Sequence, residues 1–202
     1  PPQYREVKYD LMRISYDIET DRWGALETVL SAADTGLSVL LPRVSPDGRF
    51  LLFCMAEYGC FPVYQPTSDL YLMDLQTRAY HKVSISSEYA DAWHSWSSDS
   101  RWIVFSSKRQ GGLFTRPFIS HVGADGQFGK PFVLPQRSPS FYDSCYHVYS
   151  TPELVTGPVP VDTKKLVQAI VSPTQIRIDS VTGATPETNG TETYKTGQAS
   201  VQ

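Results

Sequence analysis

The chain has 202 residues, of which 41% are hydrophobic, so most of it can fold around a core. Its 18 basic and 21 acidic side chains give a formal charge of −3, which argues against a nucleic-acid-binding protein because such proteins carry a basic surplus. The longest apolar run, Phe50 to Ala56, is too short to span a membrane.

The first strands are expected at residues 11–18 and 26–30, with a turn at 19–24 between them. They look like the back half of a repeat unit. A full unit follows, and its four expected strands are 40–44, 50–55, 69–75 and 80–85. The second of these comes after the turn Ser45-Pro46-Asp47-Gly48, in which proline and glycine stand at the positions that favour a tight turn.

The second full unit has expected strands at 92–96, 102–106, 113–122 and 128–134. Its turn, Trp96-Ser97-Ser98-Asp99-Ser100-Arg101, echoes Val44-Ser45-Pro46-Asp47-Gly48-Arg49 at an offset of 52 residues (45 to 97). A third echo is predicted at an offset of 53, where His94-Ser95-Trp96-Ser97 returns as His147-Val148-Tyr149-Ser150. Four antiparallel strands that repeat every ~40–50 residues are typical of a β-propeller blade.

The sequence therefore predicts an all-β fold: a partial β-propeller of about two and a half four-stranded antiparallel blades with an extended C-terminal tail. The expected boundaries are a half blade at 1–35, blades at 36–87 and 88–135, a blade-closing or covering segment at 136–178 and a polar, mobile tail at 179–202. Propellers have about four to eight blades, so we expect either a longer propeller of which this is the C-terminal part, or a partner that completes it.

Two elements are expected in the covering segment. Residues 162–171 could form a short helix or a strand, and a strand is favoured because Pro173 follows closely. Residues 175–179 alternate apolar and polar side chains and predict a short strand.

The turn Ser45-Pro46-Asp47-Gly48 with its apolar strand, followed by Asp69-Leu70-Tyr71-Leu72-Met73-Asp74, resembles the TolB-type propeller repeat, also called the PD40 (WD40-like) repeat. The resemblance covers about residues 10–135, and the second copy departs from it at Ser98 and Ser100. It implies a non-catalytic module that binds a protein or other ligand in the periplasm or another extracytoplasmic part of a bacterial cell envelope. Together with the charge balance and the short apolar runs noted above, we expect no nucleic acid, no transmembrane segment and no cofactor.

Five residues are candidates for a binding site. His94 and His147 hold equivalent places in the predicted repeat, near the propeller axis, where they could bind a ligand or instead form hydrogen bonds between blades. Trp93 belongs to the core or anchors a partner at the channel mouth. Arg109 and Arg116 flank a glycine-rich turn as a basic patch, which is either solvated or contacts an acidic ligand.

Catalytic and metal motifs are absent from the sequence. There is no GxSxG, HExxH, GxGxxG or P-loop, and the three cysteines, Cys54, Cys60 and Cys145, form no zinc or haem motif. We therefore expect no enzyme activity, no catalytic residue and no metal. The propeller of a prolyl-oligopeptidase-type enzyme is the weakest alternative, because its nucleophile motif is missing here.

A second alternative is an envelope redox protein. Asp179-Ser180-Val181-Thr182-Gly183-Ala184-Thr185 resembles a flavinylation motif, which implies covalent FMN on Thr185. The residues that follow depart from that family, because Pro186 and Gly190 make a poor start for the helix that normally comes next. The competing interpretation is an ordinary polar tail.

Overall fold

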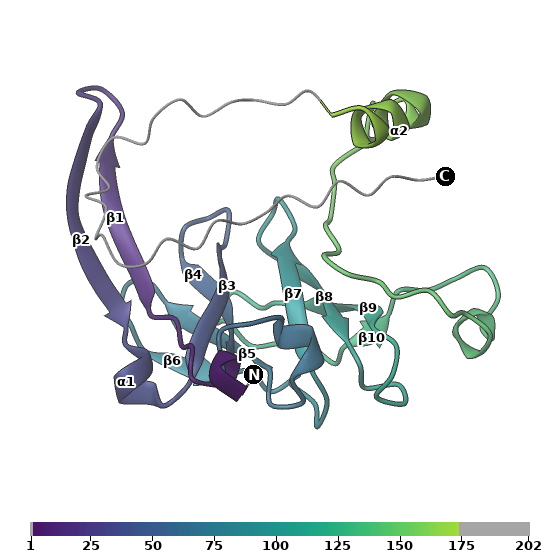
Figure 1. Ribbon diagram of the computed structural model, residues 1–202, viewed down its shortest axis with the longest axis horizontal. Coiled ribbons are helices and arrows are strands. Elements are labelled where there is room, and N and C mark those ends of the chain that lie inside the picture. The colour runs from purple at the N-terminus through teal and green to yellow at the C-terminus, as the bar shows by residue number, and fades with distance from the viewer. Residues whose placement is uncertain (1, 174–202) are drawn as a thin grey trace. The chain divides into compact units, whose positions relative to one another are not determined.

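The computed structural model describes residues 2–173, which fold as an all-β partial propeller of three antiparallel sheets (Figure 1). The first sheet has only two strands, β1 (Leu11–Asp17) and β2 (Arg22–Leu30), and is called the ribbon below. The second, blade 1, has the strands β3 (Ser38–Val44), β4 (Phe50–Ala56), β5 (Asp69–Asp74) and β6 (Tyr80–Lys82) in sequence order. The third, blade 2, has β7 (Asp91–Trp96), β8 (Trp102–Ser107), β9 (Arg116–His121) and β10 (Phe132–Val133).

Short helices lie before, between and after the strands. The helix α1 (Ala32–Thr35) joins the ribbon to blade 1, with Ser31 as its N-cap and Gly36 as its C-cap at a φ of 73°. The 3-10 helices are η1 (Pro2–Arg5), η2 (Pro62–Tyr64) and η3 (Phe141–Asp143). None of the helices within residues 2–173 is long and apolar enough to cross a membrane.

The repeat seen in the sequence is confirmed by matching hydrogen bonds in the two turns. The Ser45 hydroxyl donates to the Asp47 carboxylate at 2.6 Å, and the Ser97 hydroxyl donates to Asp99 at 2.5 Å. Each serine Oγ also accepts from the backbone five residues later, at 2.9 Å in both blades. Ser100 takes the left-handed conformation of Gly48, with a φ of 60° against 72°. The turn therefore survives the loss of its proline and glycine because the serine–aspartate bonds remain.

One backbone hydrogen bond recurs at each junction between neighbouring units. Asp91 N donates to Ser68 O at 2.9 Å where blade 2 meets blade 1, and Val39 N donates to Tyr9 O at 2.9 Å where blade 1 meets the ribbon. Because Ser68 and Tyr9 each stand just before an Asp-Leu pair that leads into β5 or β1, the two strands correspond. The ribbon is thus the outer half of a blade, with Leu11 and Arg13 in the places of Leu70 and Leu72.

The third echo predicted at an offset of 53 is wrong, because the structure repeats at an offset of 58 (91 to 149). Tyr149 N donates to Thr115 O at 3.4 Å, which is the same junction bond. The second residue after each junction has a positive φ: 55° at Leu41, 47° at Trp93 and 50° at Thr151. Residues 149–153 therefore lie on blade 2 as the first strand of a further blade would.

The apolar core has two parts that lie on opposite faces of blade 1. One part fills the space between blades 1 and 2 and includes Phe50, Leu52, Leu72 and Ile103. The other lies between the ribbon and blade 1 and includes Leu11 together with several residues of β4 and β5. Side chains of β4 alternate between these two parts, which explains why this strand is a continuous apolar run.

Residues 159–202 form a separate unit, in which the helix α2 (Thr163–Val171) is described. The expectation of a strand at 162–171 is wrong. The Asp162 carboxylate accepts from Lys164 N at 2.9 Å as an N-cap, and Pro173 follows the helix end instead of interrupting the helix. The predicted strand at 175–179 lies outside the described residues.

Candidate functional site

His94 lies at the contact between the blades, on β7. Its Nε2 is 2.9 Å from Leu52 O, which can only accept, so the ring donates from Nε2. Its Nδ1 is 3.7 Å from the Cys54 sulfur. Burial lowers the pKa of His94 to about 4 and raises the pKa of the Cys54 thiol to about 12. His94 is therefore a neutral, interior residue whose bond joins blade 2 to blade 1.

His147 does not join His94 in a pair. Its side chain is exposed, and its backbone carbonyl accepts from Arg116 at 2.8 Å. The corrected repeat places Pro152, not His147, at the position equivalent to His94. Within residues 2–173 no group of three metal-ligating side chains is found.

Arg109 is turned inward. Its Nη2 donates to the Asp91 carboxylate at 2.9 Å and to Ile85 O at 2.8 Å, and its guanidinium lies over the rings of Phe105 and Phe118. The Asp91 side chain is fully buried, and that of Arg109 is 18% exposed. The pair fixes the connection between the blades, so the expected basic surface patch does not include Arg109.

Arg116 is buried as well, beneath the segment that follows blade 2. Its guanidinium donates to the carbonyls of His147, Cys145 and Tyr142 at 2.8, 2.6 and 3.2 Å. Only 4% of the residue is exposed. These bonds hold residues 142–149 against β9, which gives Arg116 a structural role rather than a surface position.

Trp93 is half-buried at an irregular point of β7 and packs against the core between the blades. It adjoins His94 in the chain, but His94 and the two arginines use their polar groups inside the protein. The five predicted residues are therefore not gathered into one accessible site.

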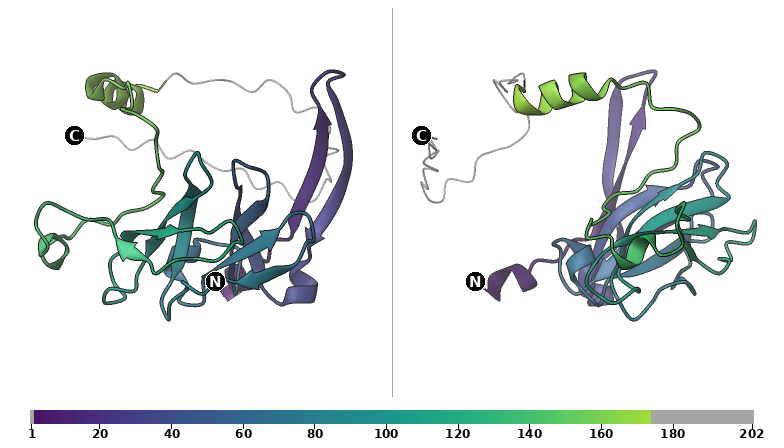
Figure 2. Two further views of the ribbon diagram at one scale, coloured as in Figure 1. Left: turned by 180° about the vertical axis from the view of Figure 1, so that it is seen from behind. Right: turned by 90° about the vertical axis from the view of Figure 1, so that its right-hand side faces the viewer.

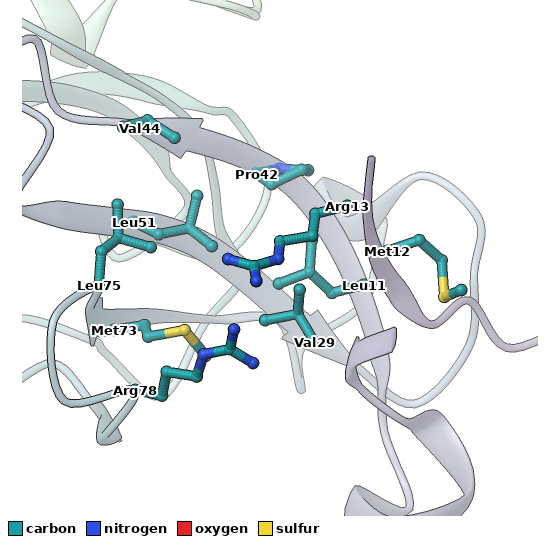
Figure 3. A pocket seen from close by; sticks show the side chains of 10 residues that line it. All are labelled: Leu11, Met12, Arg13, Val29, Pro42, Val44, Leu51, Met73, Leu75 and Arg78. Atoms are coloured by element: carbon teal, nitrogen blue, oxygen red, sulfur yellow. The ribbon is translucent and has the colours of Figure 1, made fainter. Parts of the chain in front are cut away.

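The structure instead shows a cleft of about 310 Å³ between the ribbon and blade 1 (Figure 3). Leu11 and Val29 line it from the ribbon, and Leu51 and Met73 line it from β4 and β5. In Figure 3, Leu11 and Arg13 point toward blade 1, whereas Met12 points to the other side of β1. This cleft is called the ribbon cleft below. Its walls are mainly apolar.

Two guanidinium groups stand at the ribbon cleft. Arg13 pairs with Glu27 across the ribbon at 2.7 Å, with more than half of each side chain exposed. Arg78, in the turn after β5, is exposed, and its side chain shows no hydrogen bond or ion pair within residues 2–173. The cleft can therefore take an apolar group together with a negative charge beside it.

The ribbon itself projects beyond the sheet of blade 1 (Figure 2). It also carries several large apolar side chains that are exposed. Tyr16 and Trp23 pack against each other with ring centroids 4.4 Å apart. Trp23 is 65% exposed and Leu26 is 63% exposed. The ribbon cleft could not be located from the sequence, because its walls come from segments that are distant in the chain.

Thr185 and the flavinylation-like motif lie outside the described residues.

No family model matches the chain, and no curated protein matches it. A solved structure that resembles it is the β-propeller domain of the trilobed protease from Pyrococcus furiosus, described as having an open velcro topology. The two are 15% identical with a TM-score of 0.37, and the match covers 62% of this chain and 39% of that one. The fold assignment therefore rests on the sheets and the repeat described above.

Proposed function

We propose that the chain is a non-catalytic propeller module that binds a protein partner through the ribbon. The observation that carries the proposal is the exposure of large apolar side chains on both strands of this two-stranded sheet. Met12, Ile14, Tyr16, Trp23 and Leu26 are each at least 40% exposed. Contiguous apolar surface of this kind is typical of protein-binding sites, and tryptophan and tyrosine often contribute most of the binding energy there.

The finer proposal is a TolB-like module of an extracytoplasmic compartment in a Gram-negative bacterium. Its support is the repeat Ser45-Pro46-Asp47-Gly48 followed by an apolar strand, together with the second copy that keeps the serine–aspartate bond. In this proposal the partner is a protein of the cell envelope, or the remaining blades of the same propeller, and no cofactor is needed.

The test is capture of a partner from an envelope extract by the purified chain and by a ribbon variant. Trp23→Lys combined with Leu26→Lys changes two exposed side chains, so the fold should be retained. Leu113→Lys is the matched control, because Leu113 is 70% exposed and lies outside the ribbon. We expect one defined partner, identified by mass spectrometry, to bind the wild type and the control but not the double variant.

The proposal fails if no protein is retained above background. It also fails if the retained protein binds the double variant as well as it binds the wild type.

A further inference from the structure

The contact between blades 1 and 2 shows how a blade face is covered in this protein. Ile103 and Val122 lie on the face of blade 2 that meets blade 1, and both are almost completely buried. They share one core cluster with Phe50, Leu52 and Leu72 of blade 1. Phe50 and Leu52 come from β4 and Leu72 from β5. The second strand of a blade therefore supplies two large side chains, two residues apart, to cover its neighbour.

The ribbon cleft is the corresponding place on blade 1. By the repeat, Leu51 and Leu75 stand where Ile103 and Val122 stand in blade 2, and both line the cleft. Leu11 and Arg13 of the ribbon stand where Leu70 and Leu72 stand. The ribbon has no counterpart of β4 within residues 2–173. The ribbon cleft is therefore the space that the two large side chains of such a strand would fill.

The backbone beside the cleft is also ready for a strand. β5 pairs with β6 on one edge and with β4 on the other. β1, its equivalent, pairs with β2, and the opposite edge of β1 pairs with no strand of the described residues. A strand on that edge would bring alternate side chains opposite Leu11, Arg13 and Ser15. Such addition of a strand to a free edge is a common mode of peptide recognition.

The charges at the cleft indicate which residue should precede the two apolar residues of a strand that binds there. In blade 1, Arg49 stands directly before Phe50 and donates to Ala124 O, in the turn that follows β9 of blade 2, at 2.9 Å. The corresponding turn of blade 1 holds Arg78. An acidic residue in the place of Arg49 would therefore meet the guanidinium of Arg78.

We propose that the ribbon cleft and the free edge of β1 bind an extended strand of a partner protein, in which an acidic residue precedes two large apolar residues spaced two apart. This inference rests on the proposed function and names the partner segment that it would use. The strand would pair antiparallel with β1 and place its two apolar side chains over Leu51 and Leu75, as β4 does over blade 2.

The test uses a fluorescein-labelled peptide, Ser-Pro-Asp-Gly-Glu-Phe-Lys-Leu-Thr-Val-Lys, and fluorescence polarisation with the full chain. We expect saturable binding. An isomer in which lysine and leucine are exchanged puts Phe and Leu on opposite faces, and should bind at least about tenfold more weakly because one buried leucine is lost. Two N-methylated forms of the parent peptide, each methylated at one of the two alternating sets of amides, test the backbone pairing. The form that is methylated at the N–H groups facing β1 should lose binding, and the other form should keep it.

A charge exchange tests the orientation in the cleft. Arg78→Glu should weaken binding of the glutamate peptide by about threefold, as expected for an exposed ion pair, and should favour the same peptide with lysine in place of glutamate. Arg137→Glu, at an exposed arginine outside the cleft, is the control variant. Equal binding of the two isomers, or no effect of N-methylation in both registers, would overturn the proposal.

Two further results separate this inference from the proposed function. If the envelope partner binds through Trp23 and Leu26 but the peptide does not compete with it, the function stands and the strand site is wrong. If the peptide binds with the expected selectivity but no partner is captured, the strand site stands and the function is wrong. A dimer that the peptide dissociates in sedimentation would assign the cleft to a second copy and overturn the proposal of a partner strand.

Discussion

Acidification from pH 7 to pH 5 should destabilise the protein through His94. Burial lowers the pKa of this side chain from 6.5 to about 4, so between these values the unfolded chain binds a proton that the folded protein does not. Stability therefore rises with pH across this window and falls as the pH is lowered. The full shift is worth about 3 kcal/mol, and about 2 kcal/mol of it should be lost by pH 5.

The assay is urea unfolding followed by tryptophan fluorescence at half-unit steps between pH 7 and pH 5. This range leaves out most of the effect of Asp47 and Asp99. Hydrogen bonds from Ser45 and Ser97 lower the pKa of these two carboxyls below 3.8, so their contribution is lost only at more acidic pH.

The informative variant is His94→Gln, whose amide can still donate to Leu52 O but cannot take up a proton in this range. It should cost some stability at pH 7 and remove most of the pH dependence. His121→Gln, at an exposed histidine, should keep the wild-type dependence. If His94→Gln and the wild type lose stability equally between pH 7 and pH 5, the inference that His94 is buried and neutral is refuted.

Three other predictions concern structural groups, each measured against the wild type. Arg109→Met should lower the free energy of unfolding by about 3–5 kcal/mol in urea because it leaves the buried Asp91 carboxylate without its ion-pair partner, whereas Arg137→Met on the surface should change it by less than about 0.5 kcal/mol. Gly48→Ala should cost about 1–2 kcal/mol in the same assay, since residue 48 has a φ of 72° and a side chain there is strained; an unchanged midpoint would contradict this. The Cys54 thiol, with its pKa raised to about 12 by burial, should react with a thiol reagent at pH 8 only after unfolding, which peptide mapping of the labelled protein would show.

The sequence predicted the blades well because their signals are local. The Ser45–Asp47 turn and the apolar strand after it recur as Ser97–Asp99 and its strand, and these interactions are made within a few residues. The third unit lacks that turn, so its register depended on a histidine match. In the structure, this register is set by the hydrogen bond from Tyr149 N to Thr115 O. Because the bond joins backbone atoms, it does not depend on the residue types and cannot be recognised in the sequence.

The candidate site was harder to predict because a charged residue that is buried forms internal hydrogen bonds and ion pairs instead of a binding surface. Arg109 and Arg116 flank a glycine-rich turn, which favours the surface, yet both guanidinium groups are satisfied inside by a carboxylate and by carbonyl groups. The acceptors come from residues 18 to 31 positions away, so sequence spacing does not reveal them.

The same reasoning explains why the ribbon is the part of the protein most suited to binding. A blade face is stable only when a neighbour covers it, and His94, Asp91 and Arg109 show how fully blade 2 joins blade 1. The ribbon contributes only two strands to the other face of blade 1, so part of that face remains as the ribbon cleft. An isolated two-stranded sheet is marginally stable in water. A strand bound to β1 should therefore raise the protection of the ribbon amides from hydrogen exchange, while the amides between blades 1 and 2 should keep their protection; slower exchange across both blades would instead indicate general stabilisation.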